Sequence, residues 1–246
     1  MDQHAETKRP APVLARPAMQ PAPVLARSVV GSTSPDRPCF GATTEENAQS
    51  RSARDTEAGP AVRTYEGAQF PAPGVWALDQ PHTTIEFTAR HLMVAKVKGR
   101  FAEFEGEIHV DDDPLESTVD VAIKAASIDT GEEQRDTHLR SADFFNVERF
   151  PELRFRGTRV EHAGGDDWRI IGELTIKDVT RPVTLDAVFQ GAVTDPWGKQ
   201  RVGYSAETKI DRQDFGLTWN VALEAGGWLV GNEIKIAIDV EAIRQD

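Results

Sequence analysis

The residues best suited to acid–base chemistry in this chain are two histidines and an aspartate. His138 follows Asp136 by two positions, and His91 lies in a separate segment of the sequence. An imidazole near a carboxylate can accept and return a proton close to neutral pH, so this set is a candidate general acid–base group. A histidine bonded to a carboxylate more often has a structural role, and both interpretations stay open at this point.

Motifs for other kinds of catalysis do not occur in the sequence. It contains no G-x-S-x-G elbow, no P-loop, no H-E-x-x-H and no dinucleotide-binding glycine pattern. His82, His109 and His162 lack the spacing of zinc ligands. A single cysteine, Cys39, excludes a disulfide or a thiolate metal site within one chain. We therefore expect no metal and no cofactor, and an enzyme only as the alternative to a binding protein.

The large apolar side chains that could position a site are concentrated in one part of the chain. All five Trp and nine of the eleven Phe follow residue 73, whereas ten of the fifteen Pro lie at or before it. A segment with few such side chains cannot offset the entropy lost on folding. We expect a disordered Pro/Ala-rich tail at 1–70 and one domain at 74–246. The hexapeptide APVLAR occurs twice in the tail, which is either a solubilising extension or a repeated docking motif.

The formal net charge of −12 belongs to the expected domain, because the tail contains equal numbers of acidic and basic residues. An acidic surface repels a polyanion, so we expect no nucleic-acid partner. Residues 1–20 contain no apolar run long enough for a signal peptide or a membrane helix. A cytoplasmic location without stable membrane insertion is the expectation. A homodimer and a monomer are both compatible with the sequence.

Apolar and polar residues alternate from residue 76 onward, which is typical of strands with one buried face. The expected strands cover residues 84–90, 97–110, 119–123, 153–161, 167–176, 182–193, 201–211 and 231–243. Short turns imply antiparallel neighbours, and eight such strands can close into a lipocalin-like barrel. A two-sheet sandwich is the competing all-β architecture. One short helix is expected near residues 132–140, as a lid or plug.

Inside such a barrel, the large apolar side chains of several strands either fill the centre or line a cavity. The candidates are Phe87, Phe101, Phe104, Ile123, Phe155, Leu174 and Phe189. Small barrels are often filled by their own side chains. If a cavity remains, a long hydrocarbon ligand can bind tightly there, because burial of each methylene contributes about 0.8 kcal/mol.

Several longer strings give the chain a family resemblance. They are GVWALDQPHTTIEF at 74–87, ARHLMVAKVKGRF at 89–101, QRDTHLRSADFFNVERFPELRF at 134–155, GELTIKDVTRPVTL at 172–185 and DPWG at 195–198. Together they resemble the YceI family of bacterial lipocalin-like, polyisoprenoid-binding proteins, over about residues 74–246. The resemblance implies an eight-stranded barrel with a helix over part of it and a long apolar pocket. Many relatives carry a secretion signal, and this sequence departs from them there.

The implied ligand is an isoprenoid-like lipid such as a polyprenyl phosphate or a quinone. Its head group would need donors at the mouth, which Arg135, His138 and Arg140 can supply. Ion pairs with neighbouring carboxylates are an equally good explanation of these cations. The leading hypothesis is non-enzymatic binding or carriage of this lipid. The alternative is a small-molecule enzyme of isomerase or hydrolase type that uses His91, Asp136 or His138 in the same cavity.

Overall fold

The computed structural model of this chain describes residues 61–245, apart from residues 93, 224–225 and 227. Both copies of the APVLAR hexapeptide and Cys39 therefore lie outside the described residues, as does most of the expected tail.

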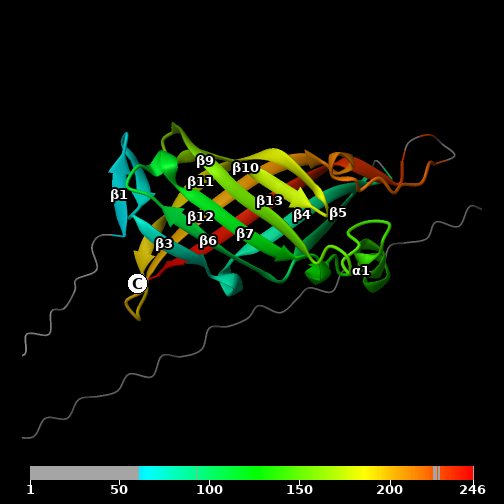
Figure 1. Cartoon of the computed structure of the whole chain (residues 1–246), viewed down its shortest axis with the longest axis horizontal. Helices are drawn as coiled ribbons and strands as arrows, with labels where there is room; N and C mark the ends of the chain where they lie inside the picture. The colour runs from blue at the N-terminus through cyan, green and yellow to red at the C-terminus, as the bar shows by residue number, and fades with distance from the viewer. Residues whose placement is uncertain (1–60, 93, 224–225, 227, 246) are drawn as a thin grey trace, which may run out of the picture. The chain divides into compact units, whose positions relative to one another are not determined.

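Eight antiparallel strands close into a barrel (Figure 1). Going round the ring, they are β3 (Gly74–Leu78), β6 (Phe104–Val110), β7 (Thr118–Lys124), β9 (Glu152–Gly164), β10 (Asp167–Ile176), β11 (Val179–Thr194), β12 (Gln200–Asp211) and β13 (Val230–Arg244). The last of these strands, β13, pairs with β12 on one edge and returns to β3 on the other. The expected barrel is confirmed, and the sandwich alternative is wrong.

Three further strands extend the same sheet beside β13. They are β4 (Thr84–His91), β5 (Ala95–Phe101) and β8 (Ile128–Asp129). The single strand expected at 97–110 is divided between β5 and β6, because Ala102 and Glu103 leave the sheet. A short 3-10 helix at Gln80–His82 separates β3 from β4, and its Pro81 has no N–H to donate to a ladder. Such breaks let long strands curve around a closed interior.

An unexpected hairpin precedes the barrel. It consists of β1 (Val62–Tyr65) and β2 (Ala68–Pro71), joined at Glu66 and Gly67, whose φ angles are 48° and 87°. Positive φ at both central residues is the geometry of a two-residue hairpin turn. The expectation of disorder over 1–70 is therefore corrected for residues 62–70. The composition of the tail alone did not predict the hairpin. Its Phe70 is buried by a contact with Trp168 of the barrel, which is far away in the sequence.

The expected helix is present as α1 (Glu133–Arg140). Glu132 caps it by accepting hydrogen bonds from the backbone N–H groups of Gln134 and Arg135. The remaining helical elements are 3-10 turns at Pro114–Glu116, Ala125–Ser127 and Arg212–Phe215. Among the described residues, no helix combines the length and the apolar character needed to cross a membrane.

Gly172 in β10 makes room for an aromatic ring inside the barrel. It lies opposite Gly157 of β9, at a β-bulge. A Cβ atom at Gly172 would lie 2.4 Å from the carbonyl oxygen of Arg156 and 2.7 Å from Cζ of Phe155. The backbone oxygen cannot move without breaking the ladder, so this position requires glycine.

We predict that Gly172→Ala lowers the free energy of unfolding by about 2 kcal/mol, because the added methyl overpacks the sheet. The matched control is Gly203→Ala in β12, where the nearest atom would lie 3.5 Å from the new Cβ. This control should change the free energy of unfolding by less than about 0.5 kcal/mol. Urea unfolding of both variants measures the difference, and equal effects would contradict the prediction.

Candidate ligand cavity in the barrel

The barrel encloses an apolar cavity of about 260 Å³. Five of the seven apolar side chains proposed from the sequence line it: Phe87, Phe101, Ile123, Phe155 and Leu174. The other two, Phe104 and Phe189, are buried but lie outside the lining. Phe104 follows the break between β5 and β6, and Phe189 packs against Tyr204 with ring centroids 5.2 Å apart. The interior is therefore a lined cavity, and side chains do not fill it completely.

One end of the cavity is closed by α1 and the segment that follows it. Leu139, Phe144 and Phe145 all line the cavity. The ring of Phe145 contacts Phe101 edge-on, with centroids 5.9 Å apart. We call this the α1 end. Sequence reasoning placed a lid or plug here but did not include these three residues in the candidate site.

His138 joins α1 to the loop after β12. Its ring lies edge-on to Trp219, with centroids 4.6 Å apart, and edge-on to Phe144 at 5.1 Å. Its Nε2 lies 3.0 Å from a carboxylate oxygen of Asp143. His138 does not line the cavity, so it supports the α1 end from outside.

The two arginines proposed as head-group contacts bind the backbone of their own chain. Arg135 donates to the hydroxyl and the carbonyl oxygen of Thr130, at 2.7 and 2.9 Å. Arg140 donates to the carbonyl oxygens of Ala126 and Ile128, at 3.0 and 2.9 Å. Neither arginine lines the cavity. They attach α1 to the β8 region, and their contact with a ligand stays a prediction.

A buried arginine that sequence patterns did not single out reaches the cavity. Arg212 is 2% exposed and belongs to the lining. Its guanidinium donates to the carbonyl oxygens of Leu217, Trp219, Val230 and Gly231 and to the side-chain oxygen of Asn232. Burial lowers the pKa of this guanidinium below its ordinary value. All five acceptors are neutral oxygens of residues 217–232. Arg212 therefore forms no ion pair with them and instead holds together the loop that carries Trp219.

The candidate acid–base residues of the alternative hypothesis are not brought together in the structure. Asp136 is buried and accepts hydrogen bonds from the backbone N–H and the hydroxyl of Thr130, whereas His138 binds Asp143 instead. His91 ends β4, opposite Ala95. None of the three candidates lines the cavity. The contact with Thr130 accounts for the Asp136 carboxylate, and the contact with Asp143 accounts for His138.

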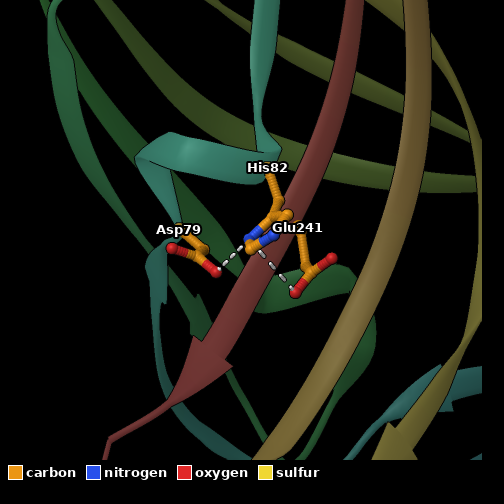
Figure 2. A group of neighbouring side chains, drawn as sticks. All are labelled: Asp79, His82 and Glu241. Atoms are coloured by element: carbon orange, nitrogen blue, oxygen red, sulfur yellow. Dashed lines mark hydrogen bonds and ion pairs between the residues drawn. The ribbon is translucent and has the colours of Figure 1, made fainter.

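Asp79, His82 and Glu241 form a cluster that resembles a metal site at first sight (Figure 2). Nδ1 of His82 lies 2.8 Å from Asp79 and 4.0 Å from Glu241. However, Nη1 of Arg201 lies 2.6 Å from the same Asp79 oxygen and 2.5 Å from the same Glu241 oxygen. A guanidinium already neutralises the position that a metal would take. The cluster is therefore an ion-pair network.

Arg201 connects four parts of the barrel. From β12 it reaches Asp79 after β3, Glu241 on β13 and, at 2.8 Å, Asp195 in the β11–β12 turn. Its hydrogen bond holds the pKa of Asp195 below the ordinary value of 3.8, against the effect of burial. Burial also acts to raise the pKa of Asp79, but the hydrogen bonds from His82 and Arg201 outweigh it and keep this pKa low. The network ties neighbouring strands together where the ring closes.

Comparison with known proteins finds a matching family model, similar sequences and similar solved structures. A family model described as "YceI-like domain" matches residues 76–242. A "UPF0312 protein" of Serratia proteamaculans is 39% identical over 164 residues, which cover 66% of this chain and 82% of the relative. A solved YceI structure from Campylobacter jejuni has a TM-score of 0.56 at 31% identity, covering 64% of this chain and 90% of that chain.

A more distant solved structure shares the fold. It is described as a polyisoprenoid binding domain from Saccharophagus degradans, and it covers 69% of this chain and 98% of its own. Its TM-score is 0.54 at 13% identity, so the likeness concerns the fold alone.

We predict that Arg201→Met lowers the free energy of unfolding at pH 7 by clearly more than the loss of one exposed ion pair does, because three carboxylates lose their shared partner. The low pKa values of Asp79 and Asp195 mean that the stabilisation is complete above pH 3.8 and is lost as the pH falls through the folded values. The effect of Arg201→Met should therefore shrink at pH 3, as measured by urea unfolding.

The matched control is Arg169→Met, which removes an exposed ion pair with Asp186 on the barrel surface. This variant should change the free energy of unfolding by less than about 0.5 kcal/mol at either pH. An Arg201→Met effect that is no larger than the control, or that grows in acid, would contradict the assignment of the network.

Proposed function

Because the chain belongs to the YceI-like domain family, we propose that its barrel binds and carries a long apolar ligand of the isoprenoid type without converting it. The observation that supports this most is the apolar cavity of about 260 Å³, with aromatic and aliphatic side chains from most of the barrel strands in its lining. Burial of hydrocarbon in such a cavity is favourable by about 0.8 kcal/mol for each methylene. The description of the Saccharophagus degradans relative as polyisoprenoid binding agrees with this ligand class.

The size of the cavity limits how the ligand is held. Its volume is just below the ~300–1,000 Å³ of typical small-molecule sites. We infer that only part of the ligand's isoprenoid tail occupies this cavity. A longer isoprenoid tail extends through the α1 end or displaces side chains there, where Phe144 and Phe145 form part of the lining.

The α1 end is the proposed route of exchange. The helix is polar over most of its surface, and its apolar contribution to the cavity comes from Leu139 near its last turn. Hydrogen bonds from Arg140 to Ala126 and Ile128 hold the helix in place without a continuous apolar interface. Displacing α1 together with residues 141–150 therefore opens the cavity, at the cost of the packing of Leu139, Phe144 and Phe145. The strands of the ring do not have to separate.

Organic extraction of the purified protein, followed by mass spectrometry, tests the binding proposal. We expect an isoprenoid lipid in an amount approaching one molecule per barrel. Ala187→Trp should abolish its recovery, because Ala187 lines the cavity and a tryptophan there fills the space. The matched control is Val188→Trp, whose side chain is exposed on the same strand. Retention of lipid by a folded Ala187→Trp variant would place the ligand elsewhere, and a lipid-free wild-type protein that binds no added isoprenoid would contradict the function.

Linking α1 to the loop after β12 tests the exchange route. In a Cys39→Ser background, cysteines introduced by His138→Cys and Trp219→Cys replace two rings that are in contact, and a short bis-maleimide can join them. We expect the link to slow exchange of a fluorescent isoprenoid at least tenfold relative to the unlinked variant.

A second linked pair controls for general stiffening of the barrel. Lys209→Cys and Glu233→Cys lie on neighbouring strands β12 and β13, where the native side chains form an exposed ion pair. This link should leave the exchange rate within a factor of two. Equal slowing by both links, or none by the first, would contradict a gate at α1.

A further inference from the structure

Four exposed apolar side chains gather at one end of the barrel. Leu92 and Val94 lie in the turn between β4 and β5, and Val221 and Trp228 lie in the segment between β12 and β13. They are between 40% and 84% exposed, and they are four of the seven large apolar side chains that are exposed among the described residues. Such a concentration of exposed apolar groups marks an interaction surface, whereas scattered single ones do not. We call these four residues the apolar tip.

Backbone hydrogen bonds bring the two segments of the apolar tip together. The N–H of Leu92 donates to the carbonyl oxygen of Leu229, and the N–H of Leu229 donates to that of Val221, both at 2.9 Å. A bridge between Ala222 and Trp228 continues the pairing. Leu92 has a φ of 51°, a backbone conformation that is unfavourable for leucine, and its side chain gains little burial there. The two segments therefore form one surface, which packing within the barrel does not explain.

Basic side chains flank the apolar tip on the outer face of β4 and β5. Residues 87–102 contain four Lys or Arg and no Asp or Glu, although the whole chain has a net charge of −12. Arg90 and Lys96 lie opposite each other in the ladder, and Lys98 is the next exposed residue along β5. These three form no ion pair within the described part of the chain, whereas Arg100 pairs with an aspartate at 3.2 Å. The tip thus combines exposed apolar groups with unpaired cations.

The segment that carries Trp228 also contacts the proposed gate. Trp219 of this segment lies edge-on to His138 of α1, with ring centroids 4.6 Å apart. The side chain of Asn220 joins the two sides of the segment, because it donates to the carbonyl oxygen of Val230 at 2.7 Å and accepts from its N–H at 3.0 Å. Figure 1 shows the segment, in orange and red, extending beyond the strands at the end of the barrel where α1 lies. A surface that contacts the apolar tip therefore lies beside the α1 end of the cavity.

We propose that the apolar tip docks on a bilayer surface that contains anionic phospholipid, so that the α1 end faces the membrane while the ligand is exchanged. This inference rests on the proposed function, because an isoprenoid dissolves in a bilayer and hardly in water. Trp228 and Val94 enter the interfacial region, where aromatic and aliphatic side chains are favoured. The three unpaired cations of β4 and β5 lie among the lipid phosphates. The contact is peripheral and reversible, since four apolar side chains are far fewer than a membrane helix requires.

The charge of the rest of the barrel determines which part of it can approach an anionic bilayer. Residues 111–113 are three consecutive exposed aspartates beside the β1–β2 hairpin, away from the apolar tip. An anionic surface repels such a group. At the α1 end, by contrast, Glu133 pairs with Arg140 at 3.4 Å, and Asp143 lies 3.0 Å from His138. The β4–β5 face is therefore the part of the molecule that an anionic bilayer attracts.

Flotation of the full chain with vesicles tests the apolar part of the surface. The vesicles contain phosphatidylcholine and phosphatidylglycerol in equal parts, and we expect the wild-type protein to bind them. Val94→Ser/Trp228→Ser should lower the affinity at least about tenfold, because the inserted side chains are lost. The matched control Val193→Ser/Trp197→Ser makes the same substitutions in the β11–β12 turn, at the other end of β12, where the side chains are 61% and 81% exposed. This control should retain the wild-type affinity within about a factor of two.

A second pair of variants tests the cations. Arg90→Gln/Lys96→Gln should lower the affinity for the same vesicles about tenfold, since each basic residue near an anionic surface adds to the attraction. It should hardly change the weak binding to vesicles of phosphatidylcholine alone. The matched control Arg159→Gln/Arg169→Gln removes the same charge from exposed positions of β9 and β10. This control should leave vesicle binding within about a factor of two of the wild-type value.

The outcomes separate docking from ligand binding. Recovery of an isoprenoid from a wild-type protein that binds no vesicles would overturn the docking surface and leave the proposed function intact. Equal losses of vesicle binding in the tip variants and in their controls would also overturn it. So would self-association of the full chain that Val94→Ser/Trp228→Ser abolishes without changing vesicle binding, because the apolar tip would then join two copies of the chain.

Discussion

The apolar interior of the barrel is the constraint on which the other features depend. A buried polar group without a partner is costly, so each one that reaches the inside must be paired or have a use. Trp76 satisfies this condition through Ala72, and Arg212 through four carbonyl oxygens and an amide oxygen. Asp136 does so through Thr130. Trp168 is the exception in the described part of the chain, because its indole N–H has no acceptor there.

The same constraint explains the difference between the two ends of the cavity. At the α1 end, Arg135 and Arg140 lie outside the lining and bind backbone oxygens, whereas Arg212 belongs to the lining and binds the oxygens of its own loop. Apolar rings such as Phe144 and Phe145 face inward. At the end beside the β1–β2 hairpin, the rings of Tyr65, Phe70 and His162 surround the indole of Trp168. One end is thus held by hydrogen bonds around its rim, and the other by aromatic packing.

Sequence patterns predicted the barrel well because strand alternation is a local signal. Phe87 and Phe155 alternate with polar neighbours, and both line the cavity. Patterns could not predict which inward residues lie beyond the cavity, as Phe104 and Phe189 do, because that depends on where strands break and rings close. They also missed the hairpin and Arg212, whose burial depends on partners far away in the sequence. Asp136 and His138 are close in sequence, yet the helix gives each a different partner.

The pairing of β13 has a consequence for how the chain reaches this fold. β13 is the last of the described strands, and its ladder partners include residues as distant in sequence as Leu78 and Ile85. During synthesis, the preceding strands are made while the edges of β3, β4 and β12 still await it. Contacts over such separations form slowly, and unpaired edges invite association between chains. The chain is therefore most exposed to such association in the interval before β13 emerges from the ribosome.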